Sequence, residues 1–130
     1  MVGRSTYLTM KRDFTYVDDV VESVIRITNV IPTPDSNWVG DRPDPSTSVA
    51  PFRLYNVGNN EPVEVLELIA LLEEALGRKA TRNFLPMQAG DVVATYADVE
   101  SLQRVTGFKP HTSMREEIAR FVEWYREFYR

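Results

Sequence analysis

The sequence predicts a small α/β domain with three or more short strands and about four helices. Three observations support this fold class. Short runs of β-branched and aromatic residues alternate with longer segments whose apolar residues recur every three or four positions. Glycine, proline and asparagine separate these segments, as expected for turns. The length of 130 residues is that of one domain, and it is sufficient for a hydrophobic core.

Composition excludes several classes of protein. With 43% hydrophobic and 26% charged residues, the chain is typical of soluble globular proteins. It contains neither an apolar run of roughly 20 residues nor the apolar core of a signal peptide, so we expect a cytoplasmic protein without membrane contact. The absence of cysteine and the single histidine, His111, argue against disulfides and most metal sites. A net charge of -4, with no basic run longer than Lys11-Arg12, argues against a nucleic-acid partner.

The first predicted strand covers residues 13–17 and leads into a helix over 18–29. The apolar residues of this helix fall at helical spacing, and we expect them to face the core. They are Val17, Val20, Val21, Val24 and Ile25. Asp18 and Asp19 suit the cap and first turn of the helix. As a charge considered alone, the preceding Arg12 is explained by an ordinary ion pair with Asp13 or Asp19.

Residues 31–51 form a predicted long surface loop. Five of the eight prolines lie here, and they remove backbone donors and favour turns. Loops of this length are either functional or mobile. Trp38 is interpreted as an anchor that packs on the domain, with a place in a binding face as the alternative.

A second strand is predicted over 52–57, followed by a turn at 58–60. An apolar stripe then predicts a helix from Val65 to Leu76, with Gly77 directly after it and its glutamates in solvent. A third strand is predicted over 81–85, ended by Pro86.

The last third of the chain contains a loop and two helices. Asp98 is expected to cap a short helix that Gly107 ends. Ser113 and Glu116 have the spacing of a capping box for the closing helix. The aromatic residues of that helix, from Phe121 to Tyr129, are interpreted as packing residues at helical spacing.

Several segments together resemble one family. Residues 12–19, Arg-Asp-Phe-Thr-Tyr-Val-Asp-Asp, are similar to a segment in the C-terminal half of extended short-chain dehydrogenases/reductases that act on nucleotide sugars, above all UDP-glucuronate 4-epimerases. Further matching segments follow in family order at 55–59, 85–92, 96–98, 107–110 and 121–129. The resemblance covers residues 10–130, the C-terminal substrate-binding portion, whereas residues 1–9 match poorly.

The resemblance implies a UDP-sugar site. Arg12 is expected to bind the pyrophosphate, for which a planar guanidinium is well suited. Asp91 is expected to bind the ribose, although a turn aspartate bonded to its own backbone explains this residue equally well. Many relatives that use other sugars carry an arginine in this loop. Here the loop reads Met87-Gln88-Ala89, which favours the glucuronate subgroup and adds Gln88 as a substrate-binding residue.

The resemblance also implies chemistry for which this sequence lacks the residues. In the family, NAD oxidises C4 of the sugar and returns the hydride to the other face. This needs a glycine-rich strand-turn-helix and a Tyr-x-x-x-Lys pair on one helix face. The sequence has no such glycine motif, and Tyr7 and Lys11 match the pair by letter only, because Lys11 adjoins the predicted strand.

We therefore expect no catalytic, cofactor-binding or metal-binding residue in this chain. NAD would be bound by a Rossmann domain of the parent protein, which is the expected partner. Two alternatives remain open: a stand-alone nucleotide-sugar binding module, or a structural or interaction remnant. An apolar edge left without its sheet would also favour self-association.

Overall fold

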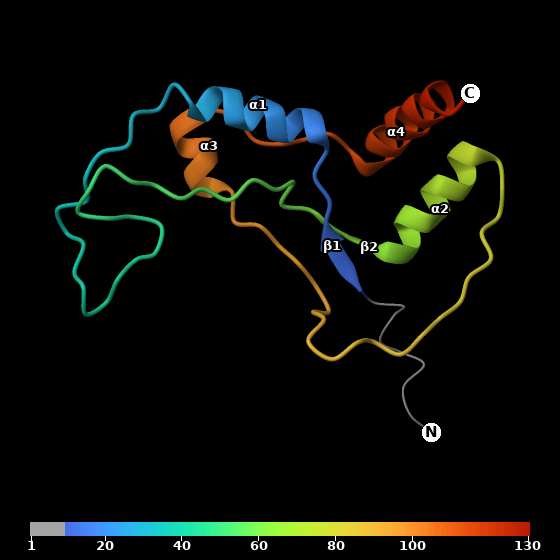
Figure 1. Ribbon diagram of the computed structural model, residues 1–130, viewed down its shortest axis with the longest axis horizontal. Helices are drawn as coiled ribbons and strands as arrows, with labels where there is room; N and C mark the ends of the chain where they lie inside the picture. Colours follow the sequence, from blue (N-terminus) through green and yellow to red (C-terminus); the bar gives the residue numbers. More distant parts are fainter. Residues whose placement is uncertain (1–9) are drawn as a thin grey trace.

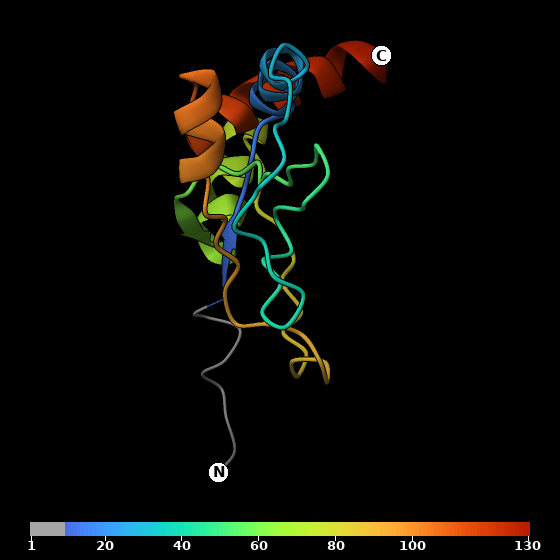
Figure 2. The ribbon, with the colours of Figure 1, turned by 90° about the vertical axis from the view of Figure 1, so that its left-hand side faces the viewer.

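The computed structural model describes residues 10–130. The elements are β1 (Lys11–Asp13), α1 (Val17–Ile27), β2 (Pro62–Glu64), α2 (Val65–Leu76), α3 (Glu100–Thr106) and α4 (Met114–Phe128). In Figure 1, α1 and α4 lie along one side of the molecule, and long connecting loops extend from the other. The view in Figure 2 shows the same separation, with the helices gathered toward one end. The α/β fold class with four helices is confirmed.

The sheet is smaller than predicted. β1 and β2 are antiparallel, with Arg12 opposite Val63. On its other edge, β1 forms a single parallel bridge between Lys11 and Ala94. The Lys11 amide donates to the Val93 carbonyl at 2.9 Å, and the Thr95 amide donates to the Lys11 carbonyl at 3.2 Å. β1 is therefore central, and the bridge brings the segment that carries Asp91 beside Arg12.

The four helices lie where their sequence signals predict them. α2 has the predicted bounds, and Gly77 follows it with φ 67°. α3 ends at Gly107 with φ 68°. The Asp98 Oδ1 accepts from the Glu100 amide at 3.0 Å, and the Ser113 Oγ accepts from the Glu116 amide at 3.4 Å.

The main core lies between α2 and α4. Its centre consists of Met114, Ile118 and Val122. Residues from β1, β2 and α2 pack around this centre: Phe14, Val63, Leu68, Leu71, Leu72 and Ala75. A second buried cluster, with Leu102 and Val99, lies where α3 packs against α1. Few large apolar side chains are fully buried elsewhere in residues 10–130.

The predicted strands are wrong in position or absent. Residues 14–16 connect β1 to α1 and are not a strand. Residues 52–57 alternate between exposed and half-buried side chains, as a strand does, but only Arg53 is bridged, to Thr47. Residues 81–85 are exposed and unpaired. A strand needs a neighbour along its length, and the described residues supply a single bridge for 52–57 and none for 81–85.

The predicted inner face of α1 is wrong as well. Asp19 and Ser23 are buried, whereas Val17, Val21 and Val24 are at least half exposed. The polar face of α1 packs on the rest of the chain because Asp19 accepts from the His111 and Thr112 amides, at 3.1 and 2.9 Å. Asp19 thus binds a distant loop instead of capping its own helix. His111 itself is exposed.

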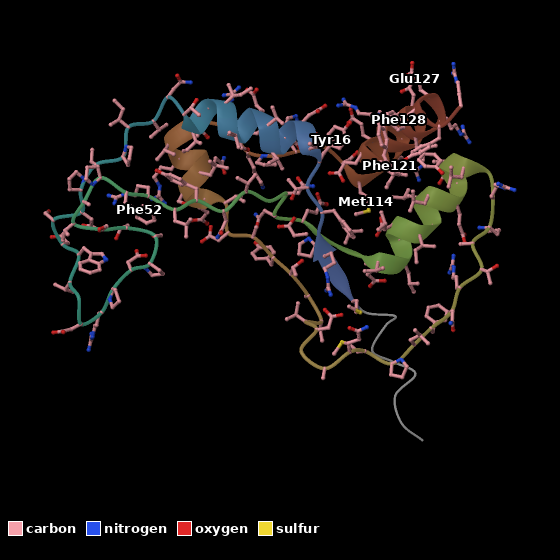
Figure 3. All side chains as sticks on the ribbon, in the orientation of Figure 1. Tyr16, Phe52, Met114, Phe121, Glu127 and Phe128 are labelled. Atoms are coloured by element: carbon pink, nitrogen blue, oxygen red, sulfur yellow. The ribbon has the colours of Figure 1, made fainter. Side chains whose placement is uncertain are left out.

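Two other interpretations of side chains also fail. Glu73 of α2 is buried, not solvated. The aromatic residues of α4 are about half exposed or more, and they pack mainly on one another. Figure 3 shows two of them, Phe121 and Phe128, along α4.

The long loop is held by its own contacts. Trp38 is half-buried, and its Nε1 donates to the Asp44 carbonyl at 3.2 Å within the same loop. Tyr7 and the rest of residues 1–9 lie outside the described residues. None of the described helices has the length and apolar character to cross a membrane.

Candidate functional site

The structure brings together two of the three residues assigned to the UDP-sugar site. Arg12 Nη2 donates to Asp91 Oδ1 at 3.0 Å, and the two residues are 79 positions apart in the sequence. Nη1 of Arg12 donates to the Lys11 carbonyl at 2.9 Å and more weakly to the Val93 carbonyl at 3.4 Å. Arg12 therefore pairs with Asp91, and not with Asp13 or Asp19.

Asp91 lies in a turn that Gly90 makes possible. Gly90 has φ 90°, a backbone angle that residues other than glycine rarely adopt. The Asp91 amide donates to the Gln88 carbonyl at 3.2 Å, and Oδ1 accepts from the Val92 amide at 2.9 Å. Asp91 is thus both a turn aspartate and the partner of Arg12. Its Oδ2 accepts no hydrogen bond from another described residue.

Gln88 contributes its backbone to this turn. Its side chain is exposed and makes no hydrogen bond with residues 10–130. The structure therefore places Gln88 three residues from Asp91 without joining its side chain to the Arg12–Asp91 pair.

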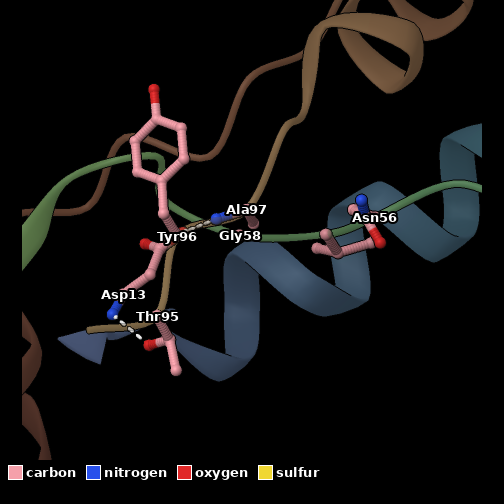
Figure 4. A pocket seen from close by; sticks show the side chains of 7 residues that line it. Asp13, Asn56, Gly58, Thr95, Tyr96 and Ala97 are labelled. Carbon is pink, nitrogen blue, oxygen red and sulfur yellow. Dashed lines mark hydrogen bonds between the residues drawn. The ribbon is translucent and has the colours of Figure 1, made fainter. Parts of the chain in front are cut away.

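A small pocket lies on the opposite face of β1. Successive side chains of a strand point to opposite faces, so Arg12 and Asp13 face different sides. The pocket has a volume of about 240 Å³. It is lined by Asp13, Asn56, Val57, Gly58, Thr95, Tyr96 and Ala97, and Figure 4 shows their side chains.

The only charged residue in this pocket already has its partners. The Asp13 carboxylate accepts from the amides of Asn59 at 3.1 Å, Asn60 at 3.2 Å and Ala97 at 2.9 Å. The Asp13 amide donates to Thr95 Oγ1 at 3.0 Å. From the sequence, Asp13 is expected only as a possible ion-pair partner of Arg12. A signal was present in Gly58, where a side chain would collide with Ala97 and with Asp13.

The described glycines do not form a dinucleotide-binding turn. Gly77 and Gly107 end helices, Gly90 forms the Asp91 turn, and Gly58 allows the close approach to Asp13. None opens a helix after a strand, which is where a pyrophosphate is held in Rossmann domains. The described residues also contain no group of three or more acidic, histidine or cysteine side chains arranged to hold a metal ion.

The arrangement is suited to binding an anion that carries hydroxyl groups. The guanidinium is held at a defined position by one carboxylate and two carbonyls, yet its side chain remains 23% exposed. The planar guanidinium can donate two parallel hydrogen bonds to two oxygens of one phosphate. The neighbouring carboxylate oxygen suits a hydroxyl donor.

No family model matches the chain. Among curated proteins, it is similar to the "uncharacterized 37.6 kDa protein in cld 5'region" of Escherichia coli O111:H-, with 48% identity over 95% of this chain and 37% of that protein. It is also similar to the "probable UDP-glucuronate 4-epimerase" of Rhizobium meliloti (strain 1021), with 46% identity over 93% of this chain and 36% of that protein. The chain thus spans about a third of the length of these relatives.

A solved structure leads to the same family. MoeE5 in complex with UDP-glucuronic acid and NAD has 30% identity and a TM-score of 0.71, over 93% of this chain and 35% of MoeE5. Over nearly its whole length, the chain corresponds to the C-terminal part of the nucleotide-sugar epimerases of the extended short-chain dehydrogenase/reductase family.

Proposed function

We propose that this chain is the substrate-binding part of an NAD-dependent UDP-sugar epimerase, with UDP-glucuronate as the substrate. The observation that carries the proposal is the contact between Arg12 and Asp91 across 79 residues of sequence. The family resemblance assigns these two residues to the pyrophosphate and to the ribose, and they lie side by side. Residues that bind adjacent groups of one nucleotide must lie close together.

Each group has binding capacity left for a ligand. Arg12 has five N–H donors, and its Nε makes no hydrogen bond with a described residue. The Oδ2 of Asp91 is likewise free to accept a ribose hydroxyl. Glucuronate as the sugar rests on the names of the relatives and on the Met-Gln-Ala sequence at 87–89.

We further propose that a second lobe, the NAD-binding lobe of the family, covers α1. Three valines on the outer face of α1 are exposed, while its polar face is buried. Residues 52–57 have the alternation of a strand but only one isolated bridge. An apolar helix face and an unpaired strand are the two features that a neighbouring α/β sheet would satisfy. On this proposal the chain binds the substrate and catalyses nothing alone.

The test is a two-dimensional amide NMR titration of the chain with UDP-glucuronate, UDP-galactose, UDP and NAD. We expect UDP ligands to shift resonances near Arg12 and from Gln88 to Asp91, and NAD to shift none. Arg12→Ala should abolish these shifts. Arg42→Ala, which removes an exposed arginine in the long loop, should preserve them. A folded chain whose spectrum does not change at millimolar UDP would refute binding by this chain.

A second variant separates the two assigned roles. Asp91→Asn removes the charge that pairs with Arg12 and weakens acceptance from a ribose hydroxyl. UDP should therefore bind more weakly to this variant. Inorganic pyrophosphate, which has no ribose, should bind at least as tightly as to the wild-type chain, because Arg12 is released from its partner. Equal weakening of both ligands would contradict the role given to Asp91.

A further inference from the structure

We infer that Asp13 is a positioning residue for the Arg12–Asp91 site. This inference rests on the proposed function and extends it to a residue on the opposite face of β1. The Asp13 side chain makes no hydrogen bond with the side chain of Arg12 or Asp91 in the described structure. It acts through the backbone that carries both of them.

The carboxylate of Asp13 joins three segments. Both of its oxygens accept backbone hydrogen bonds: Oδ1 from Asn59, and Oδ2 from Asn60 and Ala97. The Asn59 and Asn60 amides lie just before β2, and the Ala97 amide lies just after the segment bridged to β1. One side chain thus holds β1 to β2 on one edge and to the segment bridged at Ala94 on the other edge.

The position of Asp91 relative to Arg12 depends on the second of these edges. The backbone there is held to β1 by a single parallel bridge, Lys11 to Ala94. One bridge fixes the register poorly, because two backbone hydrogen bonds are easily opened. Two more hydrogen bonds hold the same segment to β1 on the C-terminal side of the bridge. The Ala97 amide donates to Asp13 Oδ2 at 2.9 Å, and the Asp13 amide donates to Thr95 Oγ1 at 3.0 Å. Asp13 therefore sets where the segment from Asp91 to Ala97 lies against β1.

Gly58 supports this reading. A Cβ at this position would overlap that of Ala97 and would lie 2.8 Å from Asp13 Oδ2. The chain approaches the carboxylate so closely that only a glycine fits. The contact is thus tightly packed as well as hydrogen-bonded.

The experiment replaces Asp13 with asparagine in the full 130-residue chain and follows UDP binding by NMR. An amide nitrogen in place of one oxygen cannot accept, so part of the contact is lost. We expect the Arg12 Nε–Hε resonance to move or broaden before UDP is added. The affinity for UDP should fall on the order of tenfold. Asp98→Asn is the matched control, because Asp98 accepts one local amide, that of Glu100, and both readouts should stay unchanged.

A double substitution distinguishes positioning from general destabilisation. Lysine at position 12 keeps the charge but cannot use the fork geometry. If Asp13 acts through Arg12, Asp13→Asn should change UDP affinity less than about twofold in an Arg12→Lys chain. Equal losses in both backgrounds would overturn the inference. Failure of wild-type UDP binding would count against the proposed function instead, and the Arg12 Nε–Hε resonance of Asp13→Asn would still decide the role of Asp13.

The wild-type chain gives an independent measurement if Asp13→Asn does not fold. If the Asp13 contacts strengthen UDP binding, bound UDP must strengthen these contacts by the same factor. UDP should therefore slow hydrogen exchange of the Asn60 and Ala97 amides, which donate to Asp13. UDP that binds at Arg12 and leaves both exchange rates unchanged would refute the inference.

Discussion

Trp124 on α4 provides a test of whether the exposed aromatic face drives self-association. Five aromatic side chains, four in α4 and one directly after it, are between 45% and 67% exposed. They are Phe121, Trp124, Tyr125, Phe128 and Tyr129. Neighbouring rings contact one another, as between Tyr125 and Tyr129 with centroids 4.8 Å apart. With roughly 200 Å² for each aromatic side chain, the cluster leaves roughly 550 Å² of apolar surface in water. This is at the upper end for a patch on a soluble monomer.

The size of the effect follows from this area. Trp124 is 49% exposed, and at roughly 250 Å² for tryptophan, the largest aromatic side chain, this corresponds to roughly 120 Å². A two-fold dimer would bury this surface twice, and at about 25 cal/mol per Å² the upper limit is about 6 kcal/mol. Because binding costs offset part of this gain, we expect Trp124→Ala to raise the dimer dissociation constant by about a hundredfold.

Sedimentation velocity over a wide range of chain concentrations measures this change. Tyr96→Ala is the control, because Tyr96 is similarly exposed but lies outside the α4 cluster. It should leave the dissociation constant unchanged. A wild-type chain that stays monomeric at high micromolar concentration would refute the reasoning, and so would a dimer that Trp124→Ala does not weaken.

Three further predictions concern the stability of the chain. Leu102 is 1% exposed, so Leu102→Ala should lower the free energy of unfolding by about 2–4 kcal/mol in denaturant titrations. Hydrogen bonds from Lys79, Ala80 and Arg82 lower the pKa of Glu73 to about 2 from its ordinary value of 4.5. The stabilisation is therefore complete above pH 4.5 and is lost as the pH falls toward 2. In Glu73→Gln this pH dependence should be reduced, as acid-unfolding curves would show. Burial and the nearby Asp19 raise the pKa of Glu117, whose Oε1 has no partner in the described structure. Ionisation of Glu117 therefore costs the folded state stability. Glu117→Gln should raise the free energy of unfolding at pH 7 by about 1 kcal/mol, and with it the melting temperature, but should raise neither at pH 4.

The helices could be predicted from the sequence because their signals are local. Gly77 and Gly107 end α2 and α3 where the positive φ of glycine is needed, and Ser113 begins α4. Their bounds depend on residues within one or two turns. The tertiary contacts of these helices do not override these local preferences.

The strands could not be predicted in the same way. Residues 52–57 have strand composition and strand-like alternation, yet they lack a neighbour to pair with. Lys11–Asp13 consists of three charged residues, and it forms a strand because β2 and Ala94 lie on its edges. The composition of a segment indicates whether it is able to form a strand. Whether a sheet is present depends on distant parts of the chain.

The choice of an inner face for α1 failed for a related reason. The periodicity of the apolar residues identifies a helix correctly, but it does not specify what will cover them. Here Asp19 and Ser23 make the inward contacts, because the carboxylate finds two amides, those of His111 and Thr112. On the proposal made above, the exposed valines form the surface that a second lobe covers.

The candidate site was only partly accessible from the sequence. Arg12 and Asp91 were assigned through the family resemblance, which gives each a role but not their contact. That contact arises from the parallel bridge at Lys11, which periodicity cannot reveal. Asp13 was missed because a carboxylate next to an arginine is first interpreted as its ion-pair partner.

Three carboxylates together explain how a chain with so few buried apolar residues is held in this fold. Asp13 and Asp19 accept from the backbone of distant segments, Asp13 from residues 59, 60 and 97 and Asp19 from 111 and 112, and Glu73 accepts from Ala80 in the loop that follows α2. Burial opposes the charged form of Asp19, but the hydrogen bonds from Thr112 and His111 outweigh it and lower its pKa. The pKa of Glu73 is lowered further, by Lys79 above all. Both groups stabilise the fold only when ionised, so stability must fall on acidification below their ordinary values of 3.8 and 4.5. These contacts connect segments that the hydrophobic clusters do not join, and the Arg12–Asp91 site lies between two of the segments so connected. The geometry of the site therefore depends on charged groups that lie outside it.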